Sequence, residues 1–176
     1  LQYYFVKHFD TYLRERGKTV IGWDEILDGS AVPSTVVMSY RGHAPASKAF
    51  EKDMKVILAP NRWCYYDYDQ EEIKDIPSNH HLFITLRKGY TYDYSKYVNP
   101  AVVDKADDLL LGIQACVWGE YIPDTPKLHL QTFPRSATIA EVTWSPDSER
   151  NWDNFRVRLG KEFERLEAQN VNYSKA

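Results

Sequence analysis

Hydrophobic and polar residues alternate with a period of two in one stretch of the chain, residues 109–120. The apolar row occupies the odd positions and consists of Leu109, Leu111, Ile113, Ala115 and Val117. This alternation predicts a strand whose two faces have different surroundings. A strand that packs one face under helices and carries Gln, Trp and Glu near its C-terminal end suits a barrel with a site at its mouth. A half-buried strand of an ordinary sheet explains the pattern equally well.

Three more apolar runs, rich in β-branched residues, predict strands at 19–23, 35–40 and 55–59. Apolar residues with a helical spacing precede the first of these runs at 2–16 and follow the second at 45–52. Helices that alternate with strands predict a parallel sheet with right-handed crossovers. The fold class predicted from the pattern is therefore α/β.

The rest of the chain is less regular before residue 100 and more helical after it. Residues 60–99 are rich in Tyr, Asp and His and show no convincing period, so we expect an irregular excursion with one short helix. Residues 100–105 predict a short helical turn. A helix at 127–142 should break near Pro134, and the clearest helix begins at Trp152.

Length and composition narrow the class of protein. A complete eight-stranded α/β barrel needs about 250 residues, so 176 residues predict either half of a barrel or a small open sheet. The net charge of −3 is scattered, which favours neither a nucleic-acid partner nor a membrane surface. The chain has no initiator Met and opens inside a predicted helix, so we expect a fragment of something larger.

Aromatic and acidic residues follow each predicted strand. The clusters are Trp23-Asp24-Glu25, Tyr40-Arg41, Tyr65-Tyr66-Asp67 and Trp118-Gly119-Glu120. The carboxyl ends of parallel strands share one rim, where such proteins bind their ligands. Aromatic rings stack on the apolar face of a sugar, and carboxylates accept hydrogen bonds from its hydroxyls. The clusters therefore predict a carbohydrate site.

Five motifs carry a family resemblance that covers nearly the whole chain. They are Gly22-Trp23-Asp24-Glu25-Ile26, Met38-Ser39-Tyr40-Arg41-Gly42, Tyr65-Tyr66-Asp67, residues 112–120, and Phe133-Pro134-Arg135 with residues 140–145. In this order and spacing the sequence resembles the β-N-acetylhexosaminidases of glycoside hydrolase family 20. The resemblance implies that residues 1–176 are the C-terminal half, strands five to eight, of a (β/α)8 TIM barrel that forms the catalytic domain.

The resemblance also implies a mechanism and a division of the active site. The substrate's own acetamide group is the nucleophile, a Glu is the general acid/base, and the Asp before it orients the acetamide. This Asp-Glu pair would lie before Leu1. The adjacent carboxylates Asp24 and Glu25 are instead interpreted as rim or structural residues. No cofactor and no metal are implied.

The family motifs assign sugar-binding roles by position. Trp23 and Trp118 resemble walls of the acetamide pocket, Tyr65 resembles the hydroxyl donor that orients the acetamide oxygen, and Asp67 and Glu120 resemble ligands of sugar hydroxyls. The competing interpretation is that each Trp fills a core and that each carboxylate is a solvated loop charge.

Tyr40 departs from the family pattern, which usually has Trp there. The smaller ring would leave a smaller wall and add a hydroxyl, and its membership of the site stays open. Arg135 and Trp144 match positions that support the barrel, so both are interpreted as structural. His80 and His81 have no partners at a metal-ligand spacing, which argues against zinc. A disulfide between Cys64 and Cys116 stays open.

These features predict part of an exo-β-N-acetylhexosaminidase that releases terminal N-acetylglucosamine or N-acetylgalactosamine from glycans. The alternatives are a non-catalytic carbohydrate-binding module derived from the same fold and a structural α/β domain with incidental aromatic residues. The expected partners are the glycan and either the missing N-terminal half-barrel or a second copy that pairs through exposed strand edges. A periplasmic or secreted location is expected from the family alone.

Overall fold

The chain divides into two compact units. The computed structural model describes residues 1–29, 31–71 and 82–175. One unit consists of Leu1–Asn61 and Asp93–Gln114, and the other of Arg62–Tyr92 and Ala115–Ala176. We call them the sheet unit and the helical unit. The predicted absence of zinc at His80 and His81 concerns a stretch outside the described residues.

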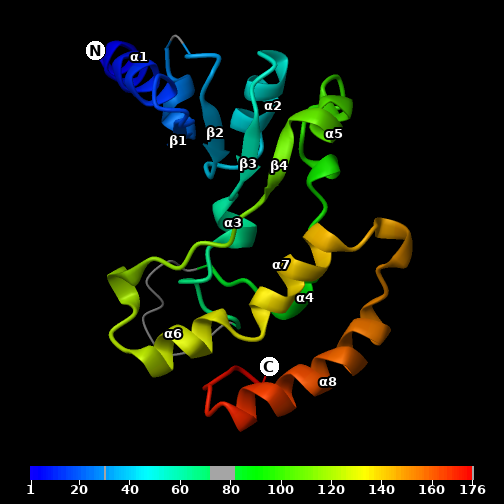
Figure 1. Ribbon diagram of the computed structural model, residues 1–176. Helices are drawn as coiled ribbons and strands as arrows, with labels where there is room; N and C mark the ends of the chain where they lie inside the picture. The colour runs from blue at the N-terminus through cyan, green and yellow to red at the C-terminus, as the bar shows by residue number, and fades with distance from the viewer. Residues whose placement is uncertain (30, 72–81, 176) are drawn as a thin grey trace. The chain divides into compact units, whose positions relative to one another are not determined.

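A four-stranded sheet forms the centre of the sheet unit (Figure 1). Its strands are β1 (Ile21–Trp23), β2 (Val36–Ser39), β3 (Val56–Leu58) and β4 (Leu110–Ile113). They pair in the order β1-β2-β3-β4, and all three pairings are parallel. The predicted parallel sheet is confirmed, with the first three strands slightly shorter than expected and the fourth much shorter. Their carboxyl ends therefore lie at one edge of the sheet.

Two helices of the sheet unit begin and end close to the predicted positions, and a third follows the turn expected at 100–105. They are α1 (Gln2–Arg14), α2 (Ala44–Glu51) and the short α5 (Ala106–Leu109). Gly17 has a φ of +68°, a conformation that suits glycine and directs the chain away from α1 toward β1. Single turns of 3-10 helix complete the unit at η1 (Asp24–Leu27), η2 (Tyr94–Lys96) and η3 (Val103–Lys105).

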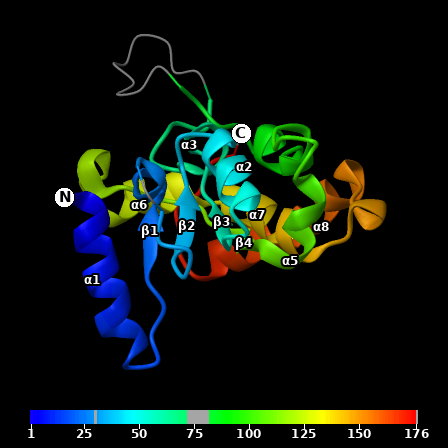
Figure 2. The ribbon, with the colours of Figure 1, turned by 90° about the horizontal axis from the view of Figure 1, so that it is seen from above.

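The core of the sheet unit lies between α2 and the sheet. Phe50 and Ala46 of α2 are fully buried against Val37, Val56 and Leu58 of β2 and β3. Figure 2 shows α2 alongside these two strands. Burying one large apolar side chain contributes about 1.5–3 kcal/mol. This packing holds β2 and β3 in place, and with them the segments that follow their carboxyl ends.

The prediction of a single strand at 109–120 is wrong, because the observed strand is much shorter. Leu109 belongs to α5, and β4 ends at Ile113. Val56 pairs with Leu110 and the next residue of β3 pairs with Gly112, so Leu111 is the extra residue of a β-bulge. Gly112 has a φ of +150°, which suits glycine.

The bulge breaks the predicted alternation. A uniform strand would bury every residue of the apolar odd row, but the Leu111 side chain is 53% exposed. Beyond β4 the chain makes only an isolated parallel bridge, between Tyr65 and Cys116, before the 3-10 turn η4 (Gly119–Tyr121). The long regular strand is thus a short strand, a bulge and an extended segment.

Helices make up most of the helical unit. The chain passes between the units at α3 (Asn61–Cys64), and α4 (Leu86–Tyr90) follows. The expectation of a single short helix in 60–99 is therefore wrong, since two α-helices and η2 lie there. The break near Pro134 is confirmed, because α6 (Thr125–Thr132) and α7 (Arg135–Trp144) are separate. The predicted last helix is α8 (Trp152–Ala168), and the turn η5 (Asp147–Glu149) precedes it.

Two aromatic clusters form the core of the helical unit. Tyr66, Tyr68 and Ile84 make one cluster, and Tyr90, Phe155 and Leu159 make the other. Helices α4 and α7 approach closely at Gly89, which lies against the buried Thr138. Among the described residues, no helix has both the length and the apolar character needed to cross a membrane.

Replacing Gly89 with Ala is expected to destabilise the helical unit. The added Cβ would lie 2.5 Å from the Thr138 Oγ1 atom, which must then move away from the Arg135 carbonyl that it binds at 2.7 Å. Overpacking of this kind should lower the free energy of unfolding by about 1–2 kcal/mol. The urea midpoint of the far-ultraviolet circular dichroism measures it.

Gly160→Ala is the matched control. No atom lies within 4 Å of the added Cβ in the interior of α8. Alanine should stabilise this helix by about 0.5–1 kcal/mol. Equal effects at the two positions would contradict the close approach of α4 and α7.

Candidate functional site

Two aromatic side chains meet where β1 and β2 end. Trp23 is the last residue of β1, and Tyr40 directly follows β2. Parallel pairing places these strand ends side by side, with Trp23 opposite Met38. The ring centroids lie 5.3 Å apart, with the planes at 81°, so one ring presents its edge to the other. Both side chains are partly exposed, which leaves aromatic surface at the edge of the sheet.

Asp24 fixes the backbone behind this aromatic pair. Its side chain is fully buried, and one carboxylate oxygen accepts hydrogen bonds from the backbone N–H groups of Tyr40 (2.8 Å) and Arg41 (3.0 Å). The other oxygen accepts a hydrogen bond from the Arg41 guanidinium. Because both oxygens are engaged inside the protein, Asp24 joins the end of β1 to the end of β2. This geometry matches the structural interpretation of Asp24.

Glu25 binds the hydroxyl of Tyr40. The Tyr40 hydroxyl donates a hydrogen bond to Glu25 Oε1 at 2.6 Å. This bond and partial burial raise the pKa of Tyr40, because both favour the protonated hydroxyl. Glu25 Oε2 is buried and has no hydrogen-bond partner among the described residues. The hydroxyl that Tyr40 adds to this position is thus engaged with a neighbouring carboxylate.

Arg41 orders the turn that follows η1. Its two Nη atoms donate to the Asp28 carboxylate, each at 3.1 Å. The bond to Asp28, and then that to Asp24, raise the pKa of Arg41, and the same interaction lowers the pKa of Asp28. Because the pair is about half exposed, its contribution to stability is small. Its effect is to fix the direction of the Arg41 side chain.

In the helical unit, Tyr65 and Trp118 lie side by side. Their ring centroids are 6.0 Å apart, with the planes at 55°. Backbone pairing brings them together, because Cys116 donates to the carbonyl of Cys64 (2.8 Å) and Tyr66 donates to the carbonyl of Cys116 (2.7 Å). The Trp118 side chain is 43% exposed, so its ring offers a face to a ligand.

The two predicted sugar-binding carboxylates have different surroundings. Asp67 is only 7% exposed, and its backbone carbonyl accepts a hydrogen bond from Gln131 at 3.1 Å. Glu120 lies on the turn η4, two residues after Trp118, and is exposed. Glu120 still fits the alternative interpretation as a solvated loop charge. Asp67 does not, because it is buried.

Arg135 holds the segment that carries Tyr65 and Asp67. Its guanidinium is fully buried and donates to the backbone carbonyls of Tyr66 (2.6 Å), Ile84 (3.1 Å), Asp69 (3.4 Å) and, from Nε, Gln131 (3.0 Å). It also lies 4.6 Å from the centre of the Tyr66 ring. Burial lowers the pKa of Arg135 to about 10, so it stays charged at neutral pH.

Sequence reasoning missed the residues that assist Arg135. Gln70 donates to the carbonyl of Phe133 at 2.9 Å, and Gln131 donates to the Asp69 carboxylate at 3.1 Å. Lys127 forms an ion pair with the same carboxylate at 3.3 Å. In the sequence, the only indication of this network is that residues 60–99 are rich in polar residues and show no period.

Cys64 and Cys116 are both buried and form no disulfide with each other. Burial raises the pKa of Cys64, so its thiol is poorly suited to nucleophilic chemistry. Among the described residues, no group of three or more His, Cys, Asp or Glu side chains is arranged to hold a metal ion.

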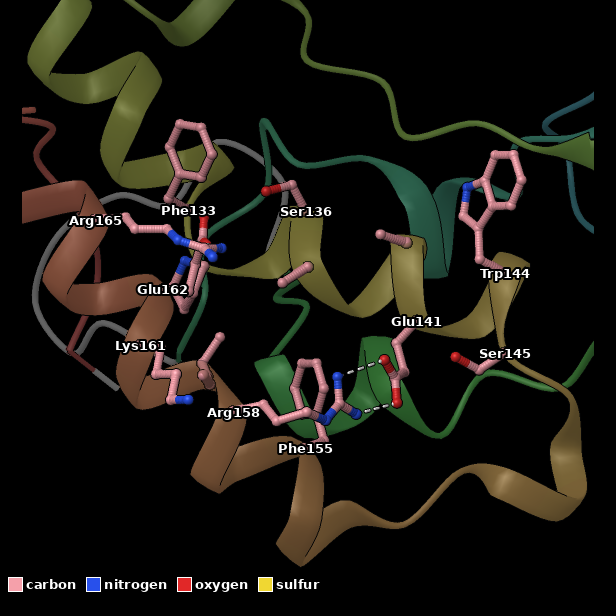
Figure 3. Close-up of a pocket in the computed structure, with 14 residues that line it drawn as sticks. Phe133, Ser136, Glu141, Trp144, Ser145, Phe155, Arg158, Lys161, Glu162 and Arg165 are labelled. Atoms are coloured by element: carbon pink, nitrogen blue, oxygen red, sulfur yellow. Dashed lines mark hydrogen bonds and ion pairs between the residues drawn. The ribbon is translucent and has the colours of Figure 1, made fainter.

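A separate hollow of about 800 Å³ lies between α7 and α8 (Figure 3). The Glu141 carboxylate of α7 pairs there with the Arg158 guanidinium of α8. None of the predicted sugar-binding residues lines it. Trp144 lies at one end, and its side chain is 87% exposed. The structural role expected for Trp144 stays a prediction, whereas the contacts of Arg135 give it such a role.

Fold and site together define a class of protein. A parallel sheet with helical crossovers, followed by aromatic and acidic residues at the strand ends, is typical of α/β enzymes that bind ligands at this edge. Residues 1–147 match the sequence profile described as "Glycosyl hydrolase family 20, catalytic domain". The chain belongs to this family.

Named relatives agree with this assignment. The chain is 34% identical over 174 residues to a beta-hexosaminidase of Porphyromonas gingivalis, a match that covers 98% of the chain and 22% of the relative. It is 30% identical over 152 residues to a beta-N-acetylhexosaminidase of Cellulomonas fimi, covering 85% of the chain and 30% of the relative. The chain thus spans less than a third of these relatives.

Solved structures confirm the fold class. The exo-β-N-acetylglucosaminidase of Vibrio harveyi, solved with N-acetylglucosamine, matches with a TM-score of 0.88 at 28% identity, covering 99% of the chain and 27% of that protein. A Streptomyces coelicolor β-N-acetylhexosaminidase matches with a TM-score of 0.83 at 27% identity, covering 98% and 35%. The chain is an α/β part of a barrel of this family. The predicted roles of the sugar-binding residues remain predictions.

Replacing Arg135 with Lys is expected to destabilise the helical unit strongly. Lysine has three donors on one atom and lacks the planar fork, so it leaves several buried carbonyls without a partner. Each such loss costs about 1–3 kcal/mol, and we expect a total near 3 kcal/mol. Chemical unfolding measures it.

Arg165→Lys is the control, because Arg165 is 74% exposed and pairs with Glu162 at 3.3 Å. Its effect should stay below about 0.5 kcal/mol. A similarly small effect at Arg135 would show that its bonds do not hold the segment.

Proposed function

We propose that the chain is part of an exo-β-N-acetylhexosaminidase that removes terminal N-acetylglucosamine or N-acetylgalactosamine from glycans. The observation that carries the proposal is the pairing of Tyr65 with Trp118 by the bridge at Cys116, in a chain of glycosyl hydrolase family 20. The names of the relatives support the substrate class. In this proposal the chain supplies the sugar and acetamide pocket of the enzyme.

The proposed reaction is a retaining, substrate-assisted hydrolysis. The acetamide oxygen of the substrate attacks the anomeric carbon while the bond to the leaving group breaks, and water then opens the oxazolinium intermediate. Tyr65 would donate a hydrogen bond that aims the acetamide oxygen at the anomeric carbon. Trp118 would contact the acetamide beside Tyr65. The same role is proposed for Trp23, which has Tyr40 beside it, from its family position alone. Such positioning lowers the barrier because attack needs one geometry.

Two carboxylates would hold the terminal sugar. Asp67 and Glu120 would accept hydrogen bonds from hydroxyls, and a bond to an ionised acceptor is about twice as strong as a neutral one. The burial of Asp67 supports this role, because a poorly solvated carboxylate favours such donors.

We propose that the acid/base pair is not among these 176 residues. Asp24 precedes Glu25 directly after a strand, so its sequence suggests a catalytic Asp-Glu pair. However, both oxygens of Asp24 are engaged and its side chain is fully buried. A general acid must reach the leaving-group oxygen. Asp24 cannot do so without breaking the junction between β1 and β2.

Turnover by the isolated chain tests whether the acid/base pair lies outside these 176 residues. The purified 176-residue protein should hydrolyse an aryl N-acetylglucosaminide no faster than buffer, whereas the native protein that contains this sequence should turn it over. Activity of the isolated chain would place the acid/base within it. A native protein that binds N-acetylglucosamine without hydrolysing it would support the binding module instead.

Tyr65→Phe in the native enzyme tests the assigned role of the hydroxyl. Loss of one aimed donor should lower kcat by about 10²–10³, with a much smaller change in KM. Tyr12→Phe is the control, because Tyr12 is 48% exposed on α1 in the other unit, and it should change kcat less than twofold. A fall confined to KM would make Tyr65 a simple binding residue.

Partners follow from the two edges of the sheet. Among the described residues, β1 pairs only with β2 and β4 only with β3, and Ile21 and Leu111 are each about half exposed. We propose that the remaining half of the barrel covers these edges in the native protein, and that the isolated chain pairs with a second copy. Sedimentation should show dimers. A strict monomer without dye-binding apolar surface would contradict this.

We propose that the native protein is periplasmic or secreted. A periplasmic or secreted enzyme would meet glycans with terminal N-acetylhexosamines, as expected from the family resemblance. The extent of the catalytic domain, residues 1–176 as its C-terminal half, is likewise a proposal.

A further inference from the structure

Another hollow of about 800 Å³ lies within the helical unit. Its lining comes from the start of α4, from α8, from residues 70–71 and from Lys175. Small-molecule sites have volumes of about 300–1,000 Å³, so the hollow is large enough for a ligand. None of the residues predicted to bind the substrate lines it. The chemistry of its own lining therefore determines which ligand it can hold.

Three cationic side chains line this hollow: Arg87 of α4, Arg156 of α8 and Lys175. Within residues 1–29, 31–71 and 82–175, none of them forms an ion pair. The Arg87 guanidinium lies over the ring of Trp152, 4.6 Å from its centre, and this contact orients the group without using its N–H donors. Cations that line one hollow without counter-ions repel one another, so a bound anion would be stabilised.

A buried amide oxygen in the wall of the hollow lacks a donor. Gln70 lines the hollow and is only 6% exposed. Its Nε2 atom donates to the backbone carbonyls of Leu130 and of Phe133, the latter at 2.9 Å, which fixes the orientation of the amide. Its Oε1 atom is buried and accepts no hydrogen bond from the described part of the chain. A ligand with an O–H or N–H group would supply the donor that this oxygen lacks.

Two carboxylates and an apolar surface restrict the ligand further. Glu71 and Asp153 line the hollow and can accept hydrogen bonds from hydroxyls. Leu86 and Phe163 add apolar surface to the lining. With three cations and two carboxylates, the lining has one net positive charge. It therefore matches a ligand with one negative charge, several hydrogen-bond donors and an apolar face.

We propose that this hollow binds an acidic sugar unit, a monosaccharide ring that carries one carboxylate. The carboxylate would bind the guanidinium groups of Arg87 and Arg156, whose planar forks match its two oxygens. One ring hydroxyl would donate to Gln70 Oε1, and the C–H face of the ring would cover Leu86 and Phe163. A neutral sugar would leave the cations without a partner, and a simple carboxylate would leave the acceptors without donors.

Binding of three small probes to the native protein that contains this sequence tests the proposal. Methyl β-glucuronoside has hydroxyls and a carboxylate, methyl β-glucoside has only the hydroxyls, and N-acetylglycine has a carboxylate with one N–H donor. Saturating N-acetylglucosamine is present throughout, so that the proposed acetamide pocket is occupied. Saturation-transfer NMR titrations give the dissociation constants. The glucuronoside should bind about tenfold more tightly than either other probe, because hydrogen bonds to charged groups are strong.

Arg87→Gln combined with Arg156→Gln removes both guanidinium groups. This double variant should weaken binding of the glucuronoside by about tenfold. Arg165→Gln is the matched control, because Arg165 is an exposed arginine of α8 that does not line this hollow. The control should keep the dissociation constant within about twofold of the native value. Thermal unfolding shows whether each variant folds, and Arg156→Gln alone tests the proposal if the double variant does not.

Three results would overturn the inference. They are equal binding of the glucuronoside and the glucoside, unchanged binding by the variants without the guanidinium groups, and N-acetylglycine binding as tightly as the glucuronoside. The last result would assign the hollow to a peptide carboxylate. Hydrolysis of an aryl N-acetylglucosaminide is measured separately on the same native protein. Its absence would contradict the proposed function and leave the binding result standing.

Discussion

A single buried guanidinium holds together the part of the helical unit that carries Tyr65 and Asp67. This segment belongs to no strand and pairs with other backbone at two isolated bridges, Tyr65 with Cys116 and Asp69 with Phe83, so few of its carbonyls have ladder partners. Arg135 supplies donors to the carbonyls of Tyr66, Asp69 and Ile84 from one planar group. A planar fork fixes direction as well as distance. The irregular segment is therefore held by these side-chain donors together with backbone hydrogen bonds, such as those from Tyr66 to the Cys116 carbonyl and from Ile84 to the Asp69 carbonyl.

In the sheet unit, a buried acidic side chain binds backbone groups in a similar way. Where β2 ends, backbone N–H groups need acceptors, and the buried Asp24 carboxylate accepts from Tyr40 and Arg41. In each unit a buried side chain, Asp24 or Arg135, thus serves backbone groups beside the candidate ligand-binding residues. Burying a charge is costly unless hydrogen bonds replace its hydration. In both cases the backbone groups that need partners provide those bonds, so one arrangement satisfies both requirements.

The sequence predicts the elements that depend on periodicity and fails where other forces act. Apolar runs located all four strands, and helical spacing located α1, α2 and α8. The strand at β4 was predicted too long because a bulge at Leu111 inserts one residue without changing the alternation of residue types. Residues 60–71 and 82–99 showed no period, and several of their carbonyls, among them those of Tyr66 and Ile84, are bound by side chains distant in sequence. The motifs identified Trp23 and Tyr40 as neighbours of a site, but the bond between Tyr40 and Glu25 has no signature in the sequence.

The choice of arginine for the buried cation has a consequence for measurements in solution. Burial brings the pKa of Arg135 down to about 10, which still leaves the side chain protonated throughout the acidic and neutral range. Histidine in the same place would change charge near neutrality and release the segment. Acidification therefore does not change the charge of Arg135, and its hydrogen bonds continue to hold the segment that carries Tyr65 and Asp67. A pH profile of ligand binding there reports the ligand and the carboxylates that face it, free of any contribution from this cation.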